Sequence, residues 1–342
     1  MIFDKSLICP VLIGRESDLQ RLERLLTQSQ DGKGQIALIS GEAGIGKSRL
    51  VREARARAPQ GTVILEGYCF QTDSALPYAP LLDLFRNFFV RYSQQEIAQA
   101  MRASAQMLLT LFPELAAAFP DLSPSGASNP NLEQEKRRLF QALAGTIMEL
   151  AQRKPLILLL EDLHWSDSTS LEFLLLLARQ VSSQPILLLL TYRSDETTPE
   201  LTHFLAELDR ERLGTELALK PMLSPEVGEM LQAILDSPQA PVSRDFLDTV
   251  FTLTEGNPFF IEEILKALTA EGDISYADGI WDRKEIDPLH IPRTIQDAVQ
   301  RRTQRLDERT LQALMLASVM GRRFDFRLLQ ELLEVDEADL LA

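Results

Sequence analysis

The chain has 342 residues, of which 45% are hydrophobic and 25% charged, and these ordinary globular values exclude a disordered or fibrous protein. The formal net charge of −15 argues against a protein that coats nucleic acid or an anionic membrane by bulk electrostatics. The two cysteines, Cys9 and Cys69, are too few for a disulfide framework and lack metal-ligand spacing, which favours a reducing, cytoplasmic environment.

Residues 11–30 predict one amphipathic helix. They open with the polar turn Ile13-Gly14-Arg15-Glu16, and leucines then recur at positions 19, 22, 25 and 26, which is helical spacing. Residues 1–5 lack the charged and apolar regions of a secretory signal peptide, and every leucine run in the chain is far shorter than a membrane-spanning helix requires. From periodicity alone, the helix over residues 11–30 is a packing helix.

The stretch between residues 41 and 48 matches the phosphate-binding pattern G-x-x-x-x-G-K-[ST] at every fixed position. Its sequence is Gly41-Glu42-Ala43-Gly44-Ile45-Gly46-Lys47-Ser48. Residues 35–40 predict a buried strand before it and residues 47–58 a helix after it, which is the context that this motif requires. The glycines let backbone N–H groups form an anion-binding nest. Lys47 is predicted to reach the β- and γ-phosphates of a nucleotide, and the Ser48 hydroxyl to bind magnesium.

A second strand is predicted at residues 62–69, after which the regular pattern lapses. Residues 70–131 predict a helical insertion, with helices at 81–92 and 94–111 and a final loop rich in Pro, Ser, Gly and Asn. Residues 132–153 then predict one long helix. The insertion contains no motif with a known function, so its role stays open.

A second chemical landmark follows Pro155, where the apolar run Leu156–Leu160 ends in Glu161 and Asp162. A near-continuously apolar strand is typical of a parallel sheet, and carboxylates at its C-terminal end lie where ligands bind in open α/β folds. One acid is expected to hold magnesium and the other to polarise an attacking water, so Ser48, Glu161 and Asp162 are the candidate metal ligands. The alternative is a strand that ends in a solvated polar turn. The nearby P-loop argues against it, because phosphate sites need an acidic metal partner.

Polar residues also follow the next apolar strand. Residues 168–181 predict a helix, and residues 185–193 predict a strand that ends in Thr191-Tyr192-Arg193. Guanidinium matches the geometry of phosphate, so Arg193 is a candidate contact for a γ-phosphate. The alternative is an ordinary surface arginine.

The C-terminal part of the chain is predominantly helical in pattern. Residues 216–222 predict a further strand, the pair Ser224-Pro225 a helix start, and residues 259–271 a helix that follows the turn Gly256-Asn257-Pro258. The predicted organisation has four parts: residues 1–222 as an α/β P-loop domain, 223–272 as helices, 273–291 as a linker, and 292–342 as two or three helices that stop without a cap. The last part holds eight arginines and nine acids, a net charge of −1, which disfavours direct DNA binding there.

In combination, the motifs resemble the ATPase module of the STAND class, the signal-transduction ATPases with numerous domains, within the AAA+ superfamily. The resemblance extends in particular to the large LuxR-type transcriptional regulators and to cyclase- and kinase-linked signalling ATPases, and it covers nearly the whole chain. Five matches carry it: Ile13-Gly14-Arg15-Glu16, Gly41 to Ser48, Leu160-Glu161-Asp162-Leu163-His164-Trp165-Ser166-Asp167, Thr191-Tyr192-Arg193 and Gly256-Asn257-Pro258-Phe259-Phe260.

The resemblance implies a P-loop NTPase fold with a parallel sheet, followed by a helical lid at 223–272 and a winged-helix-like segment at 292–342 that is apparently truncated and packs within the molecule. It implies that the segment around Val11 to Arg15 lies near the adenine and that Pro258 contacts bound nucleotide from the lid. It also implies that Arg193 is a sensor. The residues expected to share the catalytic work are Lys47, Glu161, Asp162 and Arg193. The nucleotide-binding residues that it implies are Gly14, Arg15, Gly41, Glu42, Ala43, Gly44, Ile45, Gly46, Lys47, Ser48, Arg49 and Pro258. Glu161 departs from the Asp of many P-loop ATPases, so the sequence leaves open which acid of the pair holds the metal.

The resemblance further implies a cytoplasmic signalling ATPase with ATP or ADP and Mg²⁺ as cofactors. ADP would lock a closed monomer, ATP would open it for self-association, and slow hydrolysis would reset it, while output and sensor modules would lie beyond Ala342. A transcription-regulating output is one expectation. The alternatives are an origin-recognition-type AAA+ motor or loader acting on DNA, and a P-loop kinase with a small-molecule acceptor. A GTPase is disfavoured because no Asn-Lys-x-Asp motif occurs in the sequence.

Overall fold

The computed structural model describes most of the chain, and all statements below concern that part. The described residues are 7–74, 76–122, 132–235, 242–271, 273–277, 280–283, 307–320 and 326–333. Within them, no helix is both long enough and apolar enough to cross a bilayer.

The centre of the molecule is a five-stranded sheet in the order β2-β3-β4-β1-β5, and all neighbouring strands are parallel. Its strands are β1 (Gln35–Ser40), β2 (Val63–Tyr68), β3 (Leu156–Glu161), β4 (Ile186–Tyr192) and β5 (Thr215–Ala218). β1 lies between β4 and β5, so the order of the strands reverses at β1. Open α/β sheets bind their ligands at the carboxyl ends of the strands beside such a reversal. The predicted α/β fold with a parallel sheet is confirmed.

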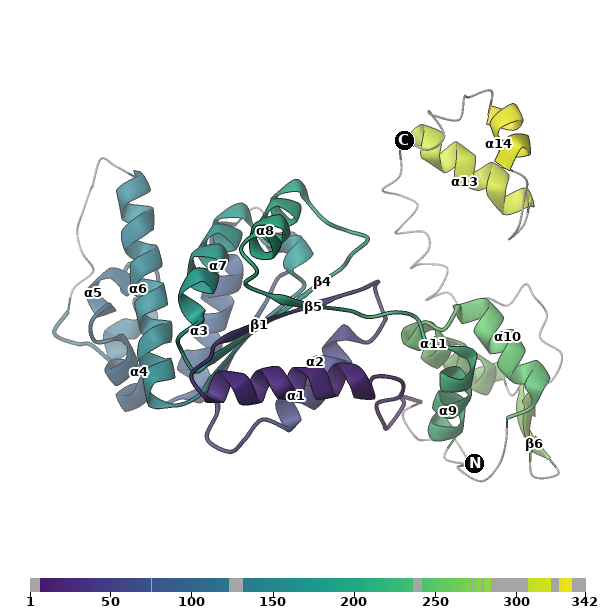
Figure 1. Ribbon diagram of the computed structural model, residues 1–342, viewed down its shortest axis with the longest axis horizontal. Coiled ribbons are helices and arrows are strands. Elements are labelled where there is room, and N and C mark those ends of the chain that lie inside the picture. The colour runs from purple at the N-terminus through teal and green to yellow at the C-terminus, as the bar shows by residue number, and fades with distance from the viewer. Residues whose placement is uncertain are drawn as a thin grey trace.

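Helices cover both faces of the sheet (Figure 1). They are α1 (Glu16–Gln30), α2 (Lys47–Ala56), α3 (Ala79–Arg91), α6 (Leu132–Arg153), α7 (Ser168–Val181) and α8 (Pro199–Arg210). Alternate side chains of a strand point to opposite faces. In β1, Ala37 and Ile39 pack in the cluster formed with α1 and α2, whereas Ile36 and Leu38 pack in the cluster formed with α3, α6, α7 and α8. Burial on both faces explains why the strands read as continuous apolar runs.

The insertion between β2 and β3 is helical, as predicted. Besides α3 it contains α4 (Gln94–Met101) and α5 (Ala105–Leu108), with short 3₁₀ turns η1 (Gln71–Asp73) and η2 (Pro113–Ala117). The single helix predicted at 94–111 is wrong, because the chain turns between α4 and α5. The Ser104 N–H donates to the Met101 carbonyl at 2.9 Å, and serine is a residue that favours such turns.

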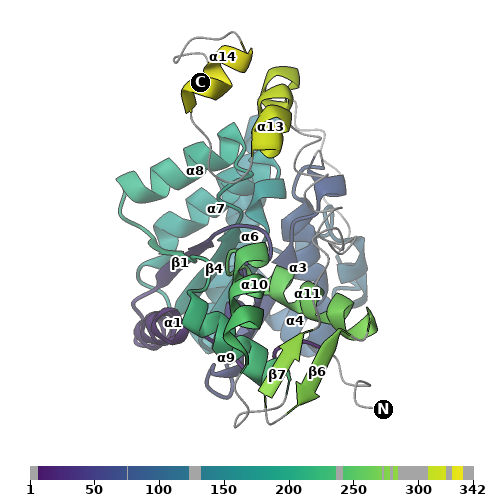
Figure 2. The same cartoon turned by 90° about the vertical axis from the view of Figure 1, so that its right-hand side faces the viewer.

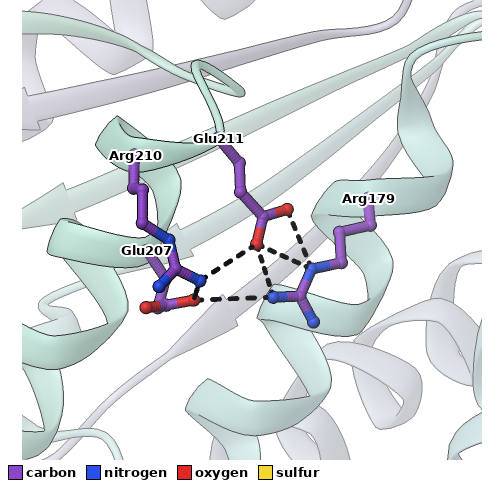
Figure 3. A network of polar contacts seen from close by, with 4 residues as sticks. All are labelled: Arg179, Glu207, Arg210 and Glu211. Carbon is purple, nitrogen blue, oxygen red and sulfur yellow. Dashed lines mark hydrogen bonds and ion pairs between the residues drawn. The ribbon is translucent and has the colours of Figure 1, made fainter.

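Helix α8 was not predicted, although its start has a recognisable signal. The Thr198 side chain caps the helix and Pro199 takes its first position, the arrangement that favours a helix start. Its buried residues Leu201, Phe204 and Leu208 pack toward the sheet. On the exposed side, four side chains join α8 to the end of α7 (Figure 3): Arg179, Glu207, Arg210 and Glu211. Because both arginines of these ion pairs are solvent-exposed, the pairs contribute little to stability compared with the apolar contacts beneath them.

A smaller helical unit, here called the lid, follows the sheet. It comprises α9 (Ser224–Ile234), α10 (Arg244–Thr254) and α11 (Pro258–Glu271), which face the viewer in Figure 2. Its core contains Val227, Phe246 and Ile261, each fully buried. Cys9 and Ile13, from the N-terminal segment, belong to the same cluster. The N-terminal segment therefore packs with the lid although it precedes the sheet in the chain.

After α11, a hairpin lies within the range predicted as a linker, 273–291. Strands β6 (Ile274–Ala277) and β7 (Ile280–Arg283) pair antiparallel. The sequence signal that was missed is the dipeptide Asp278-Gly279, a pair that favours two-residue hairpin turns. Of the predicted winged-helix-like segment, the structure describes α13 (Glu308–Met320) and α14 (Phe326–Leu333); the remaining residues of 292–342 lie outside the described residues, so that assignment stays a prediction.

Candidate nucleotide-binding site

The P-loop joins β1 to α2 as predicted. Gly41, Gly44 and Gly46 all have positive φ, at 145°, 78° and 101°, conformations that glycine adopts without strain. Lys47 is buried, and its Nζ donates to the Gly41 carbonyl at 2.7 Å and to the Glu42 carbonyl at 2.9 Å. The P-loop therefore wraps around the Lys47 ammonium. The first backbone N–H groups of α2 have no partner within the helix, so they are available to an anion.

The register of the sheet brings the predicted motifs to one edge. Ser40, just before the P-loop, pairs with Tyr192, just before Arg193. Glu161 is the last residue of β3, which is the other neighbour of β4. Three motifs far apart in the sequence therefore meet at the carboxyl edge of β1, β3 and β4.

The two acids at the carboxyl end of β3 contact different partners. The Ser48 hydroxyl donates to Glu161 Oε2, so Glu161 lies directly against the serine of the P-loop. Asp162 has φ of 62°, and its backbone N–H donates to Thr191 Oγ1 at 3.0 Å. The strand therefore ends between the two acids, in a turn held to the end of β4. Burial is the main cause that raises the pKa of both carboxyl groups, and the positive charges of Arg193 and Lys47 oppose the rise of the Asp162 pKa.

The chemistry of the Ser48 and Glu161 pair fits a magnesium ion. Mg²⁺ prefers oxygen ligands and is usually held by one or two protein groups together with waters and substrate phosphates. The hydroxyl of Ser48 and the carboxylate of Glu161 are two such oxygens in mutual contact beside the P-loop. Within the described ranges, no group of three or more His, Cys, Asp or Glu side chains forms a cage for a metal. A site of this kind would therefore bind the ion together with phosphate oxygens.

Arg193 reaches the same edge from the end of β4. Its Nη1 donates to Glu196 Oε1 at 2.8 Å, and its guanidinium carbon lies 4.9 Å from the centre of the Trp165 ring. Its positive charge acts on both Asp162 and Lys47 and lowers the pKa of each. Burial lowers the pKa of Lys47 to about 8, although the Asp162 carboxylate opposes this shift. A group with negative charge near Lys47 would favour its protonated form.

The lid docks directly on the P-loop. Asn257 Nδ2 donates to the Ala43 carbonyl at 2.9 Å, and the Phe259 N–H donates to the Gly44 carbonyl at 3.3 Å. A Cβ on Gly44 would come within 2.6 Å of Phe259 Cβ, so the contact needs glycine there. Pro258, between the two lid residues, lines the neighbouring cavity. Asn257 and Phe259 were quoted in the motif but were not predicted to contact the P-loop.

The N-terminal segment ties the lid to α2. The Cys9 N–H donates to Glu262 Oε1 of α11 at 3.0 Å, and Arg49 of α2 donates to the Cys9 carbonyl at 2.9 Å. Arg15 is buried, and its Nη2 donates to the carbonyls of Lys220 at 2.5 Å and Ile45 at 3.3 Å. Burial lowers the pKa of its guanidinium, and the geometry gives Arg15 a bracing role beside the P-loop.

These elements enclose a cavity of about 330 Å³, within the range of small-molecule sites. The predicted residues that line it are Arg15, Ala43, Gly44, Ile45, Gly46, Lys47, Ser48, Arg49, Asp162, Arg193 and Pro258. Gly14, Gly41, Glu42 and Glu161 lie next to the cavity lining and not in it. Val11, Leu12 and Ile13, from the N-terminal segment, line it as well. The lining residues that were not predicted are Ile8, Cys9, Arg52, Met222, Met230, Phe259 and Glu262. Their place in the lining depends on where the lid and the N-terminal segment dock, which no local pattern in the sequence indicates.

Comparison with known proteins assigns the chain to a family. Residues 11–190, more than half of the 342, match the family described as the AAA ATPase domain. The chain belongs to the AAA ATPase domain family. This finding confirms the predicted AAA+ ATPase module, which rested on the P-loop, the acidic strand and the Thr-Tyr-Arg strand.

Two solved structures and one curated protein are similar to most of this chain. The Aeropyrum pernix ORC2 protein, solved in ADPNP-ADP complexes, shares the fold with a TM-score of 0.53 at 16% identity, over 97% of this chain and 82% of that chain. A STAND protein with a tetratricopeptide repeat sensor from Pyrococcus horikoshii aligns with a TM-score of 0.42 at 14% identity, over 96% of this chain and 38% of that chain. An uncharacterized protein of Rhizobium meliloti (strain 1021) is 26% identical over 334 residues, which are 94% of this chain but only 31% of that protein. The chain thus spans less than a third of this curated relative.

Proposed function

We propose that this AAA ATPase domain is a STAND-type signalling switch that binds ATP, hydrolyses it slowly and controls a regulatory output through a nucleotide-dependent change of conformation. The observation that carries the proposal is the direct docking of the lid on the P-loop. Asn257 and Phe259 bond to the Ala43 and Gly44 carbonyls, which belong to the same loop whose N–H groups would hold phosphate. Any nucleotide that reshapes this loop therefore acts on the lid through two hydrogen bonds.

The residues divide the chemistry among themselves. The P-loop and Lys47 would hold the β- and γ-phosphates. The pair Ser48 and Glu161 would hold magnesium, which neutralises phosphate charge when bound. Asp162, which lies near Lys47 and Arg193, is assigned to polarise the attacking water. Arg193 is assigned to the γ-phosphate, because it enters the cavity from the strand between the P-loop strand and the acidic strand.

Two nucleotide states follow from this division. ADP occupies the P-loop without engaging Arg193 and leaves the lid docked in a closed monomer. ATP adds a γ-phosphate between Lys47 and Arg193, and this differential contact shifts the population toward an open form. The open form self-associates and acts on an output carried elsewhere in a longer cytoplasmic protein.

The lid contact supplies the test of this switch. Hydrogen exchange measured by mass spectrometry is expected to show lid residues 257–268 protected with ADP and Mg²⁺, and faster exchange with ADPNP and Mg²⁺. Asn257→Asp removes the amide that donates to the Ala43 carbonyl but keeps Oδ1, which accepts from the Phe259 N–H at 3.1 Å. In the ADP state this variant is expected to raise exchange in the lid about fivefold, the effect of one lost neutral hydrogen bond.

The control for the lid experiment is α6, whose exchange should not depend on the nucleotide or on Asn257→Asp. Equal lid exchange with ADP and ADPNP would contradict the switch. Fast steady-state turnover combined with salt-sensitive DNA binding would instead support a motor or loader that acts on DNA.

The two buried cysteines supply an independent test of where ADP binds. Burial raises the pKa of both thiols, so at pH 8 each holds less thiolate than an ordinary cysteine and reacts slowly with N-ethylmaleimide. Cys9 lines the cavity and Cys69 does not. ADP is expected to slow the alkylation of Cys9 at least threefold and to leave Cys69 unchanged, as measured by peptide mass spectrometry. Equal protection of both thiols would indicate general stabilisation and not binding in this cavity.

A further inference from the structure

In the turn that follows β4, the side chain of Glu196 forms an ion pair with that of Arg193. The Glu196 N–H donates to the Arg193 carbonyl at 3.5 Å, so the chain folds back within three residues. This turn presents the Glu196 carboxylate to the Arg193 guanidinium at 2.8 Å. The side chains are only 24% and 14% exposed, for Arg193 and Glu196 respectively, so solvent screens the pair less than it screens a surface ion pair.

Trp165 supports the same guanidinium from another element. It lies in the 3₁₀ turn η3 (Leu163–Trp165), directly after the acidic pair, and its ring faces Arg193 at 4.9 Å. A cation–π contact of this kind keeps the guanidinium near the ring while leaving its N–H groups available. Glu196 and Trp165 therefore determine together where Arg193 rests.

The resting partner of Arg193 matters because this guanidinium lies near Lys47 and Asp162 in the cavity lining, among charges of both signs. Within the described residues, Lys47 and Arg193 are the cations that act on Asp162, while Asp162, Asp195 and Glu196 act on Lys47. A γ-phosphate beside Lys47 competes with Glu196 for Arg193. ADP lacks that phosphate and leaves the pair of Arg193 with Glu196 intact.

We propose that Glu196 is a positioning residue that retains Arg193 when ADP is bound and so sets how strongly the site prefers ATP to ADP. The inference rests on the proposed function, because it takes the cavity as the nucleotide site and Arg193 as the γ-phosphate contact. The free energy that binds Arg193 to Glu196 is lost only when ATP draws the arginine away. Glu196 therefore lowers the affinity for ATP and leaves the affinity for ADP unchanged.

Glu196→Gln tests this role, since it keeps the size of the side chain and removes its charge. Titration calorimetry with ADP and with ADPNP, both with Mg²⁺, is expected to show an affinity ratio that moves about tenfold toward ADPNP, within the usual range of coupling between sites. The matched control is Glu200→Gln, which makes the same change of charge at an exposed position in the first turn of α8. Combined with Arg193→Ala, Glu196→Gln is expected to have no effect on the ratio.

A spectroscopic readout follows Arg193 itself. The chain has two tryptophans, Trp165 and Trp281, so Trp281→Phe leaves Trp165 as the reporter beneath the guanidinium. ADPNP is expected to change the emission of Trp165 more than ADP does, and Arg193→Ala is expected to remove this difference. A merely structural role for Arg193 would alter stability without producing this nucleotide-dependent signal.

The outcomes separate this inference from the proposed function. If wild-type protein binds both nucleotides and Glu196→Gln leaves their affinity ratio unchanged, or changes it as much as Glu200→Gln does, the role of Glu196 is overturned while the switch stands. If the ratio moves as expected but lid exchange is the same with both nucleotides, the switch fails and the role of Glu196 stands. Failure of the wild-type protein to bind either nucleotide overturns both.

Discussion

Lys47→Ala is expected to weaken the binding of both ADP and ATP about 30-fold or more, because truncating a buried charged partner typically costs about 2–5 kcal/mol of binding free energy. Lys47 is buried and bonded to the carbonyls of Gly41 and Glu42, so its ammonium is already in position for phosphate. Titration calorimetry measures the loss directly. Nucleotide released from the purified protein by denaturation supplies a second measurement, in which ADP retained by the wild type is absent from the variant.

Lys33→Ala is the matched control for Lys47→Ala, since Lys33 is an exposed lysine before β1 and changes the net charge equally. It is expected to leave nucleotide affinity within about twofold of the wild type, because isolated surface charges contribute little. A thermal melt of both variants checks that the fold persists. Nucleotide affinity of Lys47→Ala equal to that of Lys33→Ala would contradict the assignment of this cavity to phosphate.

The acidic pair is expected to separate into a metal ligand and a group that acts on water. Asp162→Asn should lower the rate of ATP hydrolysis about 100-fold or more, the usual contribution of a general base, while ADP affinity stays the same. Asparagine suits the test because it tolerates the positive φ of 62° that the backbone has at this residue. Glu161→Gln should instead lower the dependence of nucleotide affinity on Mg²⁺ about tenfold or more, because Glu161 lies against Ser48.

The two measurements for the acidic pair are the turnover rate under saturating ATP and the affinity for ADP with Mg²⁺ compared with EDTA. The two variants serve as controls for each other, since each removes one negative charge from the same edge of the sheet. The reverse result, in which Asp162→Asn abolishes the effect of Mg²⁺ and Glu161→Gln does not, would exchange the two roles.

Local patterns in the sequence predicted most of the sheet and its first helix–strand connections. The strand at 35–40 and the helices at 132–153 and 168–181 have the predicted bounds. Each is a run whose periodicity and end signals are contained within the run itself. Helix α8 and the β6–β7 hairpin had equally local signals, in Thr198-Pro199 and Asp278-Gly279, so these omissions were errors of interpretation and not limits of the sequence.

The sequence by itself determined the P-loop and the presence of an acidic pair and an arginine at strand ends, because these features are short and their chemistry follows from residue type and spacing. Only the tertiary structure decided the partners. Ser48 meets Glu161 across 113 residues, and Asn257 meets Ala43 across 214 residues. Contacts at such separations depend on how the sheet is ordered and where the lid docks. No local pattern encodes the order of the sheet or the docking of the lid. The contact of Glu161 with Ser48 and the link from lid to P-loop could therefore be read only from the folded chain.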